Sequence, residues 1–152
     1  MKNNKLTIYL AGKMGGLTKD EYMKWRDLLT SELTDTANIN GADIQIINPS
    51  TYFDFDNMDR HLEKEAMQFD LNMVRQSDIV IANVDGISDS IGTAIEVYEA
   101  NRLNIPVISY TYSGVVNDTI HPWIQECLST VQMTTYELID YVRDYYMVRY
   151  IK

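Results

Sequence analysis

Short apolar runs alternate along this chain with segments whose apolar residues recur every three or four positions. Runs of the first kind are typical of buried parallel strands, and the second pattern is typical of helices that cover a sheet. The predicted strands are Leu6 to Ala11, Ala42 to Ile47, a segment around Ile79 to Ile81, and Pro106 to Tyr110. Strands separated by helices predict right-handed crossovers and one parallel sheet.

The predicted helices lie between these runs. Thr18 and Glu21 have capping-box spacing at the start of the first helix, and Thr134 and Glu137 repeat it at the start of the last. The other helices are expected from about Leu62 to Gln76, from Gly92 to Leu103, briefly after His121, and from Thr134 to near Tyr150. The chain is therefore predicted to be a single α/β domain over 1–152, a flavodoxin-like or Rossmann-like three-layer sandwich with four to five strands in the order 2-1-3-4.

Polar residues follow several of the predicted strands at the edge where parallel strands end. Ligands of open α/β sheets bind beyond the carboxyl ends of the strands. The residues expected to converge there are Tyr9 to Gly12, Asn48, and the loop residues Asp85, Ser88, Asp89 and Ser90. The glycines from Gly12 to Gly16 fit neither a dinucleotide fingerprint nor a P-loop, so they predict a tight turn whose backbone N–H groups can contact an anion.

Glu96 is the strongest candidate for a reactive group. A helical side chain leans over the residue four positions earlier, and that residue is Gly92, which leaves open space above the carboxylate. The start of a helix favours negative charge, so Glu96 is expected to be ionised at neutral pH, as a nucleophile must be. The alternative is an ordinary solvated glutamate beside a tight turn.

Two further features border the expected site. Asp70 lies at the margin of the apolar face of its helix, where it is either a sheltered functional group or a solvated helix aspartate. Ser50 to Arg60 is an aromatic and acidic loop whose length suits a lid or pocket wall.

The charge and composition exclude several classes of protein. The chain has 152 residues, 45% of them hydrophobic, and a net charge of -9, which argues against a nucleic-acid partner. No apolar run approaches the ~20 residues of a membrane span. Cys127 is the only cysteine and favours a reducing compartment, so we expect a soluble cytoplasmic protein without membrane attachment.

No cofactor or metal is expected. Asp54, Asp56 and Glu65 have calcium-loop spacing, but Met58 and Asp59 occupy positions that need an oxygen ligand and a glycine. His61 and His121 have no neighbouring Cys or His for a zinc site, and no serine lies on a nucleophile elbow.

Three segments together resemble the nucleoside 2-deoxyribosyltransferase family: IYLAGKMGGL at Ile8 to Leu17, FDLNMVRQSDIVIANVDG at Phe69 to Gly86, and SIGTAIEVYEA at Ser90 to Ala100. The resemblance implies that Glu96 attacks the anomeric carbon of the sugar and that Tyr9 orients it. It also implies that Asp70 and the loop with Asp85 and Asp89 hold the base and sugar and handle protons. The substrates would be a deoxynucleoside and a free nucleobase.

The chain departs from the family pattern at two positions. The family has an aspartate six residues before its glutamate, where this chain has Ser90, with Asp89 one position earlier. Some members contribute an asparagine from a neighbouring subunit, for which Asn117 is the candidate. The turn from Gly12 to Gly16 also resembles the phosphate-binding turn of related deoxynucleoside 5'-monophosphate N-glycosidases.

Three functions therefore remain open: base exchange, hydrolysis of a monophosphate, and nucleotide sensing without catalysis. Lys13, Ser88 and Ser90 could hold a phosphate, but Asp85 and Asp89 in the same loop would repel it, which favours exchange on unphosphorylated deoxynucleosides. The last helix carries more apolar and aromatic residues than one core-facing stripe needs, so a homo-oligomer is expected.

Overall fold

The computed structural model describes residues 4–52 and 62–152. Its four parallel strands are β1 (Leu6–Ala11), β2 (Ile44–Ile47), β3 (Ile79–Asn83) and β4 (Val107–Tyr110). They are arranged in the order β2-β1-β3-β4, which confirms the predicted α/β topology. β2 begins two residues later than predicted because Ala42 instead forms an isolated antiparallel bridge with Ile151. β4 begins after Pro106, which has no N–H group to add to the sheet.

Five helices and three short 3-10 segments connect and follow these strands in the described residues. The helices are α1 (Lys19–Asn40), α2 (Leu62–Arg75), α3 (Ile91–Arg102), α4 (Pro122–Gln125) and α5 (Thr135–Tyr145), and the 3-10 segments are η1 (Pro49–Thr51), η2 (Ile87–Asp89) and η3 (Met147–Tyr150). Thr18 caps α1 as predicted, since its hydroxyl oxygen accepts a hydrogen bond from the N–H of Glu21 at 3.3 Å. None of the described helices has the length and apolar character needed to cross a bilayer.

The C-terminal helix differs from its prediction. Thr134 makes no side-chain cap bond, and α5 ends at Tyr145 instead of near Tyr150. The chain then tightens into η3, which places the fully buried Met147 in the core. Tyr136, Tyr145 and Val148 remain exposed. The apolar surplus that suggested self-association is therefore on the surface, and self-association stays a prediction.

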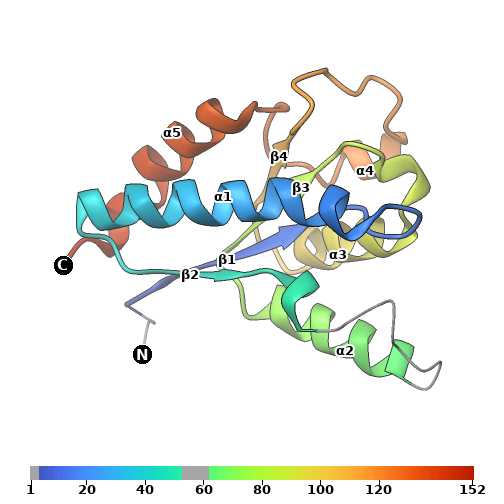
Figure 1. The fold of residues 1–152 in the computed structure, drawn as a ribbon, viewed down its shortest axis with the longest axis horizontal. Helices are drawn as coiled ribbons and strands as arrows, with labels where there is room; N and C mark the ends of the chain where they lie inside the picture. Colours follow the sequence, from blue (N-terminus) through green and yellow to red (C-terminus); the bar gives the residue numbers. More distant parts are fainter. Residues whose placement is uncertain (1–3, 53–61) are drawn as a thin grey trace.

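The sheet separates two hydrophobic cores. α1 and α5 lie on one side and α2 on the other (Figure 1). Successive residues of a strand point to opposite faces, so Leu6, Ile8 and Leu10 of β1 pack with α1 and α5. Tyr9 points to the opposite face, where the core includes residues of α2 and α3. This alternation brings Tyr9 to the side of the sheet that carries the candidate site.

α3 packs on that second face through one apolar stripe. Thr93, Val97 and Ala100 are buried at helical spacing. Glu96 lies beside this stripe, and its side chain reaches Tyr9 on β1. The predicted lid from Ser50 to Arg60 falls largely in 53–61, outside the described residues.

Candidate active site

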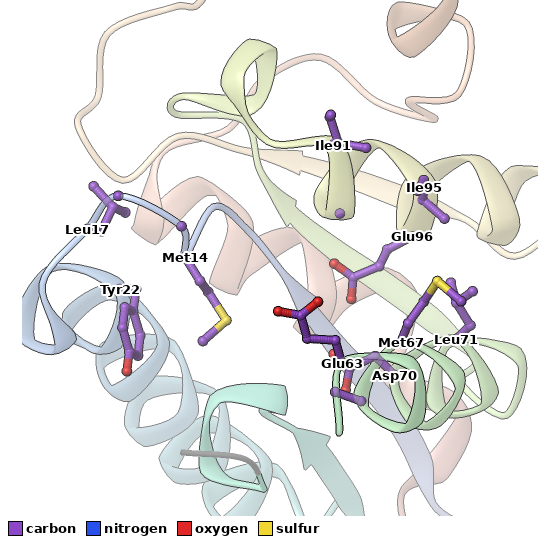
Figure 2. Close-up of a pocket in the computed structure, with 14 residues that line it drawn as sticks. Met14, Leu17, Tyr22, Glu63, Met67, Asp70, Leu71, Ile91, Ile95 and Glu96 are labelled. Carbon is purple, nitrogen blue, oxygen red and sulfur yellow. The ribbon is translucent and has the colours of Figure 1, made fainter. Parts of the chain in front are cut away.

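A cavity of about 640 Å³ opens beyond the carboxyl end of β1, between the turn that follows this strand and the helices α2 and α3. Figure 2 shows the side chains of Glu96 from α3 and of Asp70 and Glu63 from α2 around this space, with Met14 and Tyr22 opposite. The lining residues are Met14, Gly15, Gly16, Leu17, Tyr22, Glu63, Ala66, Met67, Asp70, Leu71, Ile91, Gly92, Ile95 and Glu96.

Tyr9 and Glu96 form the central polar pair of the site. The hydroxyl of Tyr9, a fully buried residue, donates a hydrogen bond to Oε2 of Glu96. Burial, followed by the nearby Glu96 and Asp70 carboxyls, raises the pKa of Tyr9 well above its usual value, so the phenol keeps its proton. The bond fixes one carboxyl oxygen of Glu96, and Figure 2 shows the carboxyl group turned into the cavity.

The protonation of Glu96 differs from the sequence-based expectation. Burial raises the pKa of Glu96 to about 8, while the hydrogen bond from Tyr9 acts in the opposite direction. The helix dipole does not offset burial, because its effect fades within the first turn and Glu96 is the sixth residue of α3. In this structure Glu96 therefore holds a proton at neutral pH, which differs from the expected ionised carboxylate.

Asp70 is a half-buried carboxyl group on the α2 wall of the same cavity. Its Oδ1 atom is buried and has no hydrogen-bond partner among the described residues. Burial raises the pKa of Asp70 to about 6, and the positive charge of Arg26 partly opposes this shift. Asp70 is therefore not an ordinary solvated helix aspartate, which was the alternative considered from the sequence.

Arg26 is a charged component of the site that sequence analysis missed. It is 1% exposed, and its guanidinium donates to the carbonyl oxygens of Tyr22 at 2.6 Å and Gly12 at 2.9 Å. Burial lowers the pKa of Arg26 to about 10, while Glu96, Tyr9 and Asp70 favour its charged form. It lies within the apolar stripe of α1, four residues after Tyr22 and three before Leu29, and this spacing is the signal that could have identified it.

Two predicted site glycines have different structural roles. A Cβ atom at Gly12 would lie 2.4 Å from Cζ2 of Trp25, so Gly12 is required for the packing of α1 on the end of β1. A Cβ atom at Gly92 would meet nothing within 4 Å. Gly92 also lines the cavity, which agrees with the open space inferred above Glu96.

The loop after β3 does not converge on this cavity as predicted. Asp85 lines a separate cavity of about 450 Å³ together with Lys13. Its carboxylate accepts hydrogen bonds from Thr111 Oγ1 at 2.8 Å and from the Ser113 backbone N–H at 2.8 Å. These bonds tie the loop to the segment after β4, so Asp85 has a structural role where it lies.

The remaining predicted binding residues are also outside the lining of the main cavity. Ser88 borders a third, shallow cavity, and Asp89 is exposed in η2. The hydroxyls of Ser90 and Thr93 are hydrogen-bonded to each other at 2.7 Å. Asn48 is buried, and its Oδ1 accepts from the N–H of Ser50 at 3.1 Å. The structure thus unites Tyr9, Asp70, Gly92 and Glu96, and places the other five polar candidates around this group.

Two residues considered in the sequence analysis, Asn117 and His121, have side chains that are hydrogen-bonded within their own chain. The side chain of Asn117 donates to the carbonyl of Val84 at 3.0 Å and accepts from Thr119, so it is bonded without a neighbouring subunit. Nδ1 of His121 accepts from the N–H of Trp123 at 3.1 Å and caps α4.

Comparisons with solved structures agree with this fold. A 2-deoxyribosyltransferase from Bacillus psychrosaccharolyticus is similar with a TM-score of 0.64 at 19% identity, over 96% of this chain and 97% of that chain. A conserved protein from Enterococcus faecalis has a TM-score of 0.71 at 13% identity, over 92% of this chain and 98% of that chain. The CMP N-glycosidase BcmB from Clostridium botulinum has a TM-score of 0.54 at 14% identity, over 91% of this chain and 98% of that chain.

A search of curated proteins finds no match. The model of the nucleoside 2-deoxyribosyltransferase family, however, matches residues 8–119, which include most of β1 and all of α2, β3 and α3. This range contains Tyr9, Asp70 and Glu96, the three carboxyl and hydroxyl groups that the fold brings together at the cavity. The chain therefore belongs to the nucleoside 2-deoxyribosyltransferase family, and with it to the class of glycosyltransferases and N-glycosidases.

Proposed function

We propose that this enzyme transfers 2-deoxyribose from one nucleobase to another through a covalent glycosyl intermediate on Glu96. The observation that carries the proposal is the hydrogen-bonded Tyr9–Glu96 pair, which lies at the wall of a cavity that also contains Asp70. Tyr9 occupies Oε2 of Glu96, so Oε1 is the oxygen that attacks. The bond from Oε1 to C1′ forms as the C1′–N bond breaks, and the bonding electrons pass to the base nitrogen.

The second half of the reaction reverses these bonds with a new base. A ring nitrogen of the acceptor attacks C1′, the ester to Glu96 breaks, and the acceptor nitrogen loses its proton. The leaving base needs one proton in the first step. At a pH between the pKa of Asp70 at about 6 and the pKa of Glu96 at about 8, these two carboxyls together hold one proton. Productive binding requires that this proton moves to Asp70 or to the base while Glu96 ionises.

The charge of the cavity supports an unphosphorylated substrate. Its described lining contains three carboxyl groups, those of Glu63, Asp70 and Glu96, and neither lysine nor arginine. A phosphate dianion would meet like charges, and Arg26, which donates to backbone carbonyls, does not line the cavity to offset them. The repulsion that sequence analysis assigned to Asp85 and Asp89 thus comes from different residues. The apolar side chains around the cavity also suit a flat base better than water, which favours exchange over hydrolysis.

The alternative function is hydrolysis of deoxynucleoside 5'-monophosphates. The observation that favours it is that the backbone of Gly15 and Gly16 borders the cavity, where amide N–H groups could contact a phosphate. Lys13 and Ser88, the other predicted phosphate ligands, line different cavities.

One assay distinguishes the two functions. The purified chain is incubated with deoxynucleosides and with their 5'-monophosphates, each with and without a free base of a different kind, and the products are separated. We expect a new deoxynucleoside that forms only when the free base is present, and slower turnover of the monophosphates. Free base and deoxyribose 5-phosphate as the only products would instead establish the hydrolase. Mass spectrometry of a denatured reaction should show one deoxyribosyl group on the peptide that contains Glu96.

A further inference from the structure

The charged side chains of the active-site cavity are all hydrogen-bond acceptors when ionised. Glu63, Asp70 and Glu96 supply carboxyl oxygens, and apart from Tyr22 the other described lining residues are apolar or glycine. A carboxylate accepts hydrogen bonds but cannot donate one. The ligand must therefore supply the donors. Glu96 and Asp70 are already assigned to the sugar carbon and to the proton of the leaving base, which leaves Glu63 without a role.

Glu63 extends the acidic wall along α2. It precedes Asp70 by seven residues, so both lie on the same face of the helix, about 10 Å apart along its axis. Figure 2 shows the Glu63 carboxylate turned into the cavity. The side chain is exposed and makes no hydrogen bond or ion pair with a described residue. Its oxygens are therefore free to accept from a ligand.

The base of a bound deoxynucleoside is the part that can reach Glu63. In the proposed reaction C1′ lies at Glu96 and the glycosidic nitrogen near Asp70, so a base that extends along α2 toward Glu63 passes the apolar side chains of Ala66 and Met67. Adenine, cytosine and guanine carry an exocyclic amino group, which is a donor. Hypoxanthine and uracil carry a carbonyl oxygen where adenine and cytosine carry that amino group.

We propose that Glu63 is a specificity-determining residue that accepts a hydrogen bond from the exocyclic amino group of the base. The inference rests on the proposed function and names its substrate class, deoxynucleosides of amino-bearing bases. A carbonyl oxygen at the same place faces a carboxylate, so both acceptors are left without a hydrogen and the complex is weaker.

The test compares substrates that differ only in this group. The ratio of kcat/KM is measured for deoxyadenosine against deoxyinosine and for deoxycytidine against deoxyuridine, each with the same acceptor base. A hydrogen bond to a charged group contributes about 1.5 to 3 kcal/mol, so the wild-type enzyme should favour each amino substrate by about tenfold to a hundredfold. Glu63→Gln should reduce both ratios to within about threefold, because an amide can either donate or accept.

A matched control lies two residues along the same helix. Glu65 is exposed but does not line the cavity, so Glu65→Gln removes the same charge from the same helix and should leave both ratios unchanged. A faster reaction of Glu63→Gln with deoxyuridine would be a gain that misfolding cannot produce. Wild-type ratios near one, or ratios that Glu63→Gln leaves unchanged, would overturn the proposal. If Glu63 instead accepts a hydrogen bond from the 5′-hydroxyl of the sugar, Glu63→Gln leaves the ratios unchanged.

A binding measurement separates this inference from the proposed function. Glu96→Gln should bind deoxynucleosides without converting them, so calorimetry gives affinities that do not depend on turnover. A preference for deoxycytidine over deoxyuridine that disappears in the Glu63→Gln, Glu96→Gln double variant supports the inference even if the reaction is hydrolysis. Equal affinities in the single variant contradict it even if base exchange is confirmed.

Discussion

Glu96 and Glu99 lie one turn apart on α3 and face opposite environments. Glu96 borders the cavity, and burial raises its pKa to about 8. Glu99 is 8% exposed, but Arg102 donates to its oxygens at 2.8 and 3.1 Å and Arg75 donates at 2.9 Å from α2. These hydrogen bonds lower the pKa of Glu99 to about 2.

The difference shows what makes a carboxyl group reactive in this fold. Both glutamates lie in the contact between α2 and α3, yet only Glu99 has guanidinium partners. Arg26, the cation that acts on Glu96, donates to the backbone carbonyls of Gly12 and Tyr22. A carboxylate with bonded arginines is a permanent charge that joins two helices. A buried carboxyl group without such a partner takes up and releases protons near neutral pH.

The largest expected difference in kcat is between the glutamine variants of these two glutamates. Glu96→Gln should lower kcat by about a thousandfold or more, since an amide is a weak nucleophile. Glu99→Gln should keep kcat within about threefold, because Glu99 does not line the cavity. Steady-state kinetics of base exchange measure both. Comparable losses in the two variants would mean that Glu96 has no special chemical role.

Asp70→Asn should lower kcat by about a hundredfold through loss of the proton donor. The wild-type kcat/KM should have a bell-shaped pH profile with an acid limb near pH 6 and an alkaline limb near pH 8. The reason is that the free enzyme is active when the pair formed by Asp70 and Glu96 holds one proton. In the variant only Glu96 titrates, and it must be ionised, so the rate should rise with pH without the alkaline decline. If kcat/KM of the variant still falls at alkaline pH, the alkaline limb belongs to a group other than this pair of carboxyls.

Tyr9→Phe should lower kcat by about tenfold to a hundredfold, which corresponds to roughly 1.4 to 2.7 kcal/mol, because the carboxyl of Glu96 loses the bond that orients it. The alkaline limb of the pH profile, which follows the pKa of Glu96, should also move to higher pH, since the hydrogen bond from Tyr9 lowers this pKa. An unchanged rate and an unchanged limb would show that Tyr9 only fills the core.

The smallest effect concerns stability and has opposite signs for the two glutamates. The raised pKa of Glu96 means that its ionisation opposes folding, with no penalty below pH 4.5 and the full penalty above about 8. The lowered pKa of Glu99 means that its charge stabilises the fold above pH 4.5 and that this is lost as the pH falls toward 2. Thermal denaturation at pH 8 should therefore give Glu96→Gln a higher Tm than wild type and Glu99→Gln a Tm lower by about 3 °C. Equal shifts would contradict the comparison.

The strands, their order and the Tyr9, Asp70 and Glu96 group could be predicted from the sequence. Apolar runs mark strands that are covered on both faces, and short motifs mark the reactive group. The direction of the loop after β3 could not be predicted, because it depends on hydrogen bonds from Thr111 and Ser113 to Asp85 across 26 and 28 residues. The proton on Glu96 was also missed, since burial is a property of the packed helices and not of the helix terminus.

Arg26 and Glu63 were missed for a related reason. The position of Arg26 in the apolar stripe of α1 indicated burial but not its place beside the cavity, and Glu63 is a charged residue at an ordinary helical position. Arg26 is buried because Gly12 and Trp25 allow α1 to approach the end of β1. Glu63 borders the cavity because α2 lies along it.

The empty space at Gly92 makes the enzyme suitable as a fluorescent reporter of its own ligand. Gly92 has no neighbour within 4 Å of a built Cβ atom and lies one helical turn from Glu96. A thiol introduced as Gly92→Cys would border the cavity, whereas the one native cysteine, Cys127, is buried. A thiol-reactive dye should therefore label this single position. A bound nucleoside would occupy the same space and slow this labelling, so the labelling rate would report nucleoside binding without a coupled assay or a radioactive base.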